Sequence, residues 1–130
     1  MNSTSLATIR EWNLALSLQA EEPDLLQVEC AGDVVLPDFR PENDPLTKLL
    51  GPQVYSRKVL LNMERVNCLD TSGISWLISC HENCQHAGGM LVLYAIPPRV
   101  RYILQLLRME QLLHVAPDLA AARSLALKRA

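Results

Sequence analysis

The sequence contains 130 residues, a length that suits one domain with its own hydrophobic core. Apolar residues make up 49% and charged residues 20% of the chain, and this balance excludes an intrinsically disordered protein. The net charge of −2 and the aromatic content of 5% exclude a general nucleic-acid-binding protein, which needs basic side chains and stacking rings.

No segment predicts membrane insertion or export. The longest uninterrupted apolar run covers residues 90–96, whereas a membrane-spanning helix needs about twenty residues. The N-terminal residues lack the basic and then apolar pattern of a secretory signal. The spacing of the cysteines does not suggest a disulfide framework (Cys30, Cys68, Cys80 and Cys84). We therefore expect a cytoplasmic protein with free thiols.

Charge is unevenly distributed along the chain. Residues 1–57 hold nine acids and four bases, a net charge of −5, whereas residues 58–130 hold five acids and eight bases, a net charge of +3. This asymmetry could steer a partner to one face, or it could simply reflect two solvated surfaces of different charge.

The N-terminal part is weakly patterned. Residues 14–18 and 25–30 predict two strands, and the acidic, proline-containing segment 21–24 predicts the turn between them. Prolines then interrupt the chain up to residue 52, and only segment 45–50 is expected to be helical. Asp44 can cap that helix.

The C-terminal part is strongly patterned, with strands and helices alternating. We predict these elements in chain order: a buried strand over 58–63, a helix from the Asp70-Thr71 turn to Gly88-Gly89, a strand over 90–95, a helix after Pro97-Pro98, a short strand over 112–115, and a helix over 119–128 capped by Asp118. This order predicts a single α/β domain over residues 1–130 with a partly parallel sheet.

The most informative element is Asp70-Thr71-Ser72-Gly73, at the predicted strand-to-helix turn. The N-terminus of a helix has unpaired N–H groups and a partial positive charge, so it stabilises an attached phosphate. Phosphorylation there would add a charge of about −1.5 to −2. The element could therefore be a switch, although a helix cap alone would explain the same residues.

The spacing of several segments resembles the STAS domain of the anti-sigma factor antagonist family. The strand 59–63, the element 70–73, and Gly88-Gly89 with the strand that follows carry the resemblance. It continues through 96–100, 103–104 and 109–113. The match is good over residues 58–128 and is only an outline over residues 10–57.

The resemblance implies a small mixed sheet with helices packed mainly on one face. It also implies a partner-switching regulator that is not an enzyme and needs no cofactor or metal. Thr71 would be the phosphorylation site and Ser72 the fallback. An anti-sigma factor kinase would phosphorylate the site and a serine/threonine phosphatase would reverse this. The expected partner interface comprises Asp70, Thr71, Ser72, Gly73, Ile74, Ser75 and Trp76, and a homodimer is possible.

The sequence departs from the family pattern at three places. Threonine stands at position 71, where serine is commoner, and Asn62 replaces the usual aspartate. The stretch 34–55 is rich in proline where the family usually has a regular helix.

Other interpretations remain open. The same fold could be a non-switching module, such as a scaffold of a signalling complex or a subunit of a lipid-transport ATPase. Cys80, Cys84 and the histidines near them could instead form a metal or thiol site. The arginines at 99, 101 and 108 predict either a solvated face or a site for an acidic partner or phosphate. Trp12 and Trp76 are expected to be packing residues, although Trp76 lies away from the predicted apolar face of its helix and could instead meet a partner.

Overall fold

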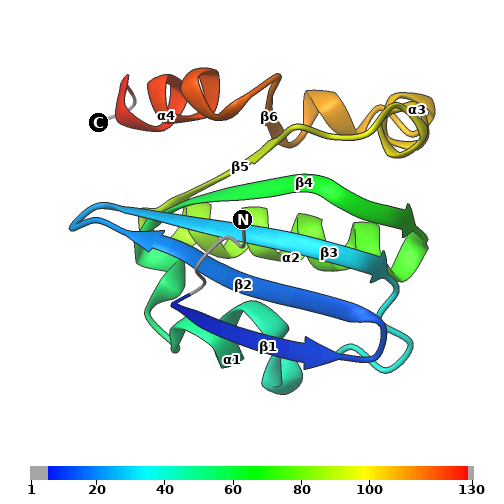
Figure 1. Ribbon diagram of the computed structural model, residues 1–130, viewed down its shortest axis with the longest axis horizontal. Coiled ribbons are helices and arrows are strands. Elements are labelled where there is room, and N and C mark those ends of the chain that lie inside the picture. Colours follow the sequence, from blue (N-terminus) through cyan, green and yellow to red (C-terminus); the bar gives the residue numbers. More distant parts are fainter. Residues whose placement is uncertain (1–5, 129–130) are drawn as a thin grey trace.

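The computed structural model describes residues 6–128 and contains one six-stranded sheet with the strand order β1-β2-β3-β4-β5-β6 (Figure 1). The first three strands are antiparallel, and β3 to β6 are parallel to one another. Their bounds are β1 Ala7–Glu11, β2 Leu14–Glu21, β3 Leu25–Val34, β4 Lys58–Leu69, β5 Met90–Tyr94 and β6 His114–Ala116. The expected mixed sheet is therefore confirmed.

Four α-helices connect or follow the parallel strands: α1 Pro45–Leu50, α2 Thr71–Ala87, α3 Pro98–Leu106 and α4 Leu119–Lys128. Local sequence explains where they begin. Asp118 caps α4 by accepting the Ala121 N–H at 2.9 Å, and prolines occupy the first positions of α1 and α3. No helix between Leu6 and Lys128 has the length and hydrophobicity that a membrane crossing requires.

Alternation along the central strands builds two cores, one on each face of the sheet. Leu61 of β4 belongs to the larger core, which α1, α2 and α3 cover, and its neighbour Leu60 belongs to the smaller core. Small residues of α4, including Ala122 and Ala126, pack into that smaller core. The helices therefore lie mainly on one face, as expected, and α4 covers part of the other.

Several strands differ from the sequence-based prediction, and β2 and β3 both extend beyond the expected 14–18 and 25–30. Strand β4 continues to Leu69 rather than ending at residue 63, because its C-terminal half keeps pairing with β3 across two register shifts. Strand β1 was not predicted, since it is only five residues long, is mostly exposed and has Ile9 as its one large apolar side chain. The last strand begins at His114, because Leu112 ends a 3₁₀ turn over Met109–Gln111.

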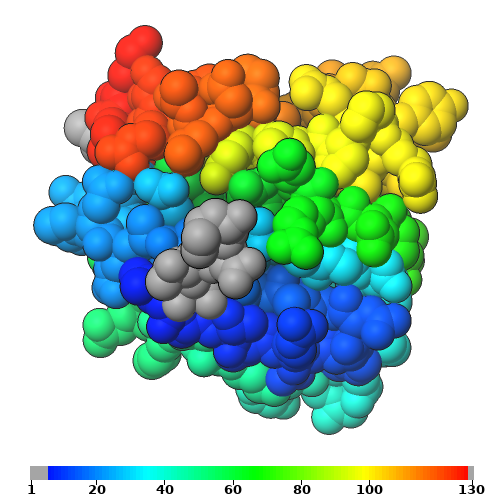
Figure 2. All heavy atoms as spheres, viewed as in Figure 1, coloured from blue at the N-terminus to red at the C-terminus, as the bar shows by residue number. Residues whose placement is uncertain are grey.

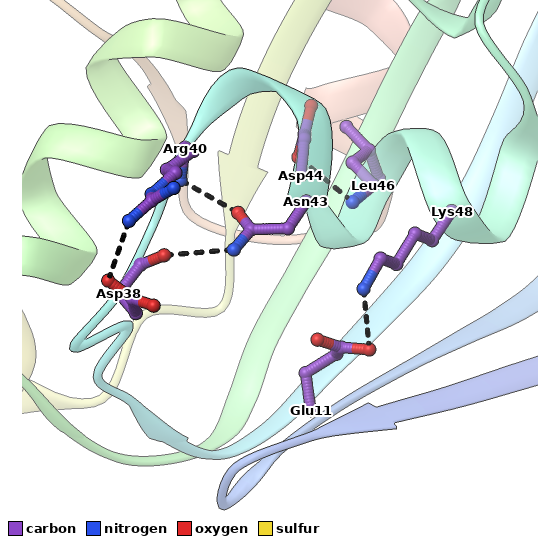
Figure 3. Close-up of polar contacts among 7 residues, drawn as sticks. All are labelled: Glu11, Asp38, Arg40, Asn43, Asp44, Leu46 and Lys48. Carbon is purple, nitrogen blue, oxygen red and sulfur yellow. Dashed lines mark hydrogen bonds and ion pairs between the residues drawn. The ribbon is translucent and has the colours of Figure 1, made fainter.

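The proline-rich segment before β4 is anchored by the buried carboxylate of Asp44. This carboxylate accepts the Leu46 N–H at 3.1 Å and the Thr47 hydroxyl at 2.9 Å, and also the hydroxyl of Tyr55. Figure 3 shows Asp44 beside Leu46 at the start of α1 and Lys48 of the same helix reaching Glu11 of β1. The segment is therefore ordered by side-chain hydrogen bonds and not by one long helix.

Candidate functional site at the start of helix α2

The candidate site lies where two neighbouring parallel strands end. Val34 at the end of β3 pairs with Leu69 at the end of β4, and α2 begins at Thr71. Ligand sites in sheets of this kind form outside the carboxyl ends of the strands. The topology thus places the Asp70-Thr71-Ser72-Gly73 element on such an edge.

Asp70 is the N-cap of α2. Its carboxylate accepts the Ser72 hydroxyl at 2.5 Å and the Gly73 N–H at 3.0 Å. These hydrogen bonds hold the pKa of Asp70 below its usual value, and the bond from Ser72 has the largest effect. Desolvation acts in the opposite direction. Asp70 is therefore a carboxylate at neutral pH, directly beside Thr71.

The two neighbouring hydroxyls differ in what they contact. The Ser72 hydroxyl donates to Asp70 and accepts the Leu36 N–H at 2.8 Å, which ties the loop after β3 to the start of α2. Thr71 is exposed, and its hydroxyl makes no hydrogen bond to any residue from 6 to 128. Of the two, Thr71 is the hydroxyl that a second protein can reach without breaking an internal contact.

Gly73 permits the first turn of α2 to approach β3 closely. A Cβ atom at this position would lie 2.1 Å from the Val34 carbonyl oxygen and 2.7 Å from Cδ1 of Leu69. Such distances exclude any larger residue unless the backbone shifts. Gly73 is buried and acts as a positioning residue for Thr71, not as a contact surface.

The expected partner interface is only partly at the surface. Ser75 is exposed, but Ile74 is 7% exposed and Trp76 only 1%. The prediction that Ile74 and Trp76 face a partner is wrong, because the Trp76 indole N–H donates to the buried carboxylate of Asp44 at 2.8 Å. Trp76 therefore packs beneath the segment that leads into α1.

Two hollows lie along the same edge of the sheet, and neither was predicted from the sequence. One has a volume of about 420 Å³ and is lined by Trp12, Asn13, Asp33, Val35 and Pro37. The other has a volume of about 320 Å³ and is lined by Val66, Asn67, Pro97, Pro98 and Arg99.

Trp12 at the β1–β2 turn is 44% exposed and has a φ of 57°. Trp12, which was expected to be a packing residue, is therefore only partly packed and does not lie in the core. A positive φ is unusual for a bulky residue, and here it belongs to the two-residue turn that pairs Glu11 with Leu14. The turn leaves the indole at the surface beside the larger hollow.

The charged groups near the site can be identified from their effects on the pKa of Cys68. Cys68 is exposed, and its pKa is raised by partial desolvation, then by a hydrogen bond to Asp33 and by the charges of Asp33 and Asp70. Arg99 acts in the opposite direction. The surface around Cys68, near the end of β4, therefore carries two carboxylates and one nearby guanidinium.

The rival metal or thiol site is not assembled. Cys80, Cys84 and His81 are buried, and residues 6–128 contain no group of three or more His, Cys, Asp or Glu side chains placed to bind a metal ion. Burial raises the pKa of the Cys84 thiol to about 12, and it also raises that of Cys80. Because the thiolate is the metal ligand and the nucleophile, these two cysteines act as core residues.

Comparisons with known proteins agree with this geometry. The STAS domain profile matches residues 5–122. An anti-sigma factor antagonist from Mycobacterium paratuberculosis has a similar structure, with a TM-score of 0.63 and 15% identity, over 95% of this chain and 93% of that one. The anti-sigma factor antagonist SpoIIAA in its unphosphorylated form gives a TM-score of 0.56 and 15% identity, over 79% and 89% of the two chains.

A STAS domain protein from Planctomyces limnophilus gives a TM-score of 0.55 and 16% identity, over 79% of this chain and 91% of that one. At these identities the structural similarities establish the fold alone. A comparison with curated protein sequences gave no match. The profile match spans most of the 130 residues, and the chain belongs to the STAS domain family.

Proposed function

We propose that this chain is an anti-sigma factor antagonist that binds an anti-sigma factor kinase through the surface at the start of α2. Phosphorylation of Thr71 would control this binding. The observation that carries the proposal is the contrast between two adjacent hydroxyls: Thr71 is exposed and unbonded within the described chain, whereas Ser72 is held by Asp70 and Leu36. The similar structures named above include anti-sigma factor antagonists, which supports the same function.

The switch acts by electrostatics at the docking surface. Unphosphorylated Thr71 is small and neutral, so a partner can cover it at little cost. A phosphate adds a charge of about −1.5 to −2 beside the carboxylate of Asp70, and a partner would have to desolvate both groups. A loss of about 2.7 kcal/mol in binding free energy corresponds to a hundredfold weaker complex.

The fold itself need not change. Thr71 makes no hydrogen bond within residues 6–128, so its modification breaks none there. The positive end of the α2 dipole also offsets part of the added negative charge. The proposal therefore describes a protein of the bacterial cytoplasm that regulates transcription by competing for a partner and has no catalytic activity of its own. A serine/threonine phosphatase would restore the binding form.

Capture from the native extract followed by phosphorylation tests the proposal. Immobilised wild type, Thr71→Ala and Thr71→Glu serve as baits, and bound proteins are identified by mass spectrometry. We expect a kinase on the first two baits and none on the third. Incubation with ATP should then place phosphate on Thr71 of the wild type, and the Thr71→Ala chain should stay unmodified.

Gln85→Glu is the matched control, because it adds one negative charge at an exposed position of the same helix. Residue 85 is fourteen positions from Thr71, about 21 Å along the helix. The control should retain the kinase. Capture of the same partners by all three Thr71 baits would contradict the switch and would identify a constitutive scaffold instead.

A further inference from the structure

Exposed apolar side chains are concentrated on α3 and the turn that follows it. Seven large apolar residues are more than 40% exposed in the described chain, and four of them lie within eleven residues: Tyr102, Leu106, Leu107 and Leu112, at 61%, 63%, 46% and 43%. Figure 2 shows this segment, coloured yellow to orange, as the projecting upper right corner of the molecule. A patch of this kind marks a surface that meets another protein or a membrane.

The patch belongs to a helix that is already packed by its opposite side. Val100 and Leu104 of α3 are fully buried in the larger core. Tyr102 and Leu106 are four residues apart and so share another face of the same helix. Val100 and Leu104 therefore stabilise the core, whereas Tyr102 and Leu106 are left exposed.

Basic side chains surround the patch. Arg101 is paired with Glu110 at 3.2 Å, and Glu110 is the only acidic residue between positions 98 and 114. Arg99 and Arg108 form no ion pair within residues 6–128. The surface therefore combines protruding apolar side chains with two arginines that form no ion pair in the described chain.

We propose that this patch docks reversibly on an anionic lipid bilayer. The arginines complement the negative surface potential of such a membrane, and leucine and tyrosine side chains are suited to its interfacial zone. A symmetric contact with a second copy would bring the arginines of both copies together.

The inference is independent of the switch at Thr71, and vesicle flotation of the full chain tests it. The probes are vesicles of phosphatidylcholine alone and vesicles with roughly one third phosphatidylglycerol. We expect at least about tenfold stronger binding to the anionic vesicles, and a marked loss of binding between about 0.1 and 0.5 M salt.

Two pairs of variants identify the surface. Leu106→Ser should weaken binding about fivefold or more, whereas Leu127→Ser should not, because Leu127 is 54% exposed on α4 at the other end of the molecule (Figure 1). Arg108→Gln should weaken binding about fivefold, whereas the exposed Arg40→Gln, with the same change in net charge, should have little effect.

Equal binding to both kinds of vesicle, or equal effects within either pair of variants, would overturn the inference. Sedimentation without lipid tests whether a second copy of the chain covers the patch instead. A dimer that dissociates in the Leu106→Ser variant would assign the patch to a second copy and would also overturn the inference.

Discussion

Ser72 and Leu36 are joined by a hydrogen bond of 2.8 Å that links the start of α2 to the loop after β3. The same hydroxyl donates to Asp70, so both its donor and acceptor capacity are used within the fold. The neighbouring Thr71 has no such contact in the described chain. Ser72 therefore stabilises the turn, whereas the hydroxyl of Thr71 is accessible for modification.

Alanine substitutions should separate these two roles. Ser72→Ala leaves the Leu36 N–H without its acceptor, and we expect it to lower the free energy of unfolding by about 1–2 kcal/mol. Thr71→Ala removes no internal hydrogen bond and should change stability by less than about 0.5 kcal/mol. Urea denaturation measures both. Equal losses in the two variants would show that Thr71 is also a structural residue.

Gly73→Ala should destabilise the start of α2. The new Cβ would meet the Val34 carbonyl oxygen at 2.1 Å, so the helix must move away from β3. We expect a loss of about 1–3 kcal/mol in unfolding free energy, together with weaker partner binding. Ser75→Ala, at an exposed position two residues further along, is the control and should be nearly neutral. A fully stable Gly73→Ala variant would contradict the close approach.

The carboxylate of Asp44 should be important for stability because it is buried and accepts several donors. Asp44→Ala leaves the Trp76 indole N–H and the Leu46 N–H without their acceptor, and we expect a loss of about 3 kcal/mol. Asp118→Ala removes the cap of α4 at an exposed site and should cost about 1 kcal/mol. Thermal unfolding followed by circular dichroism distinguishes the two, and similar losses would argue against a special role for Asp44.

Stability should fall in alkaline solution because buried thiols keep their protons. The pKa values of Cys30 and Cys84 are raised to about 12 in the folded chain, from an ordinary value of 9. Between these pH values the unfolded chain releases protons that the folded chain retains, so each thiol lowers stability by about 1.4 kcal/mol per pH unit. Cys84→Ala should reduce this slope in urea titrations, and an unchanged slope would contradict the burial of that thiol.

The sequence predicted best what depends on local interactions. Asp44 and Asp118 cap the helices assigned to them, and Asp70, one of three candidate caps, caps α2, because a capping bond spans only two or three residues. The alternation of strands and helices after residue 58 was also enough to indicate an α/β fold. For the site, the same locality identified the Asp70-Thr71-Ser72-Gly73 turn.

Contacts between distant segments could not be predicted in this way. Helical periodicity placed Trp76 outside the predicted apolar face of α2 and left open whether it packs inside or meets a partner, whereas the structure buries it with Leu77. Its true partner, Asp44, is 32 residues away on the segment that packs over α2. The functions of Ser72 and Gly73 likewise depend on Leu36 and Val34, which only the folding of β3 beside β4 brings near.

The affinity of the partner kinase for phosphorylation-mimicking variants tests the central claim most directly. Calorimetry with the isolated kinase should give similar dissociation constants for wild type, Thr71→Ala and Gln85→Glu. Thr71→Glu should bind about a hundredfold more weakly, a change of about 2.7 kcal/mol. If Thr71→Glu instead binds as tightly as Gln85→Glu, Thr71 is not the switch and the surface at the start of α2 does not control partner binding.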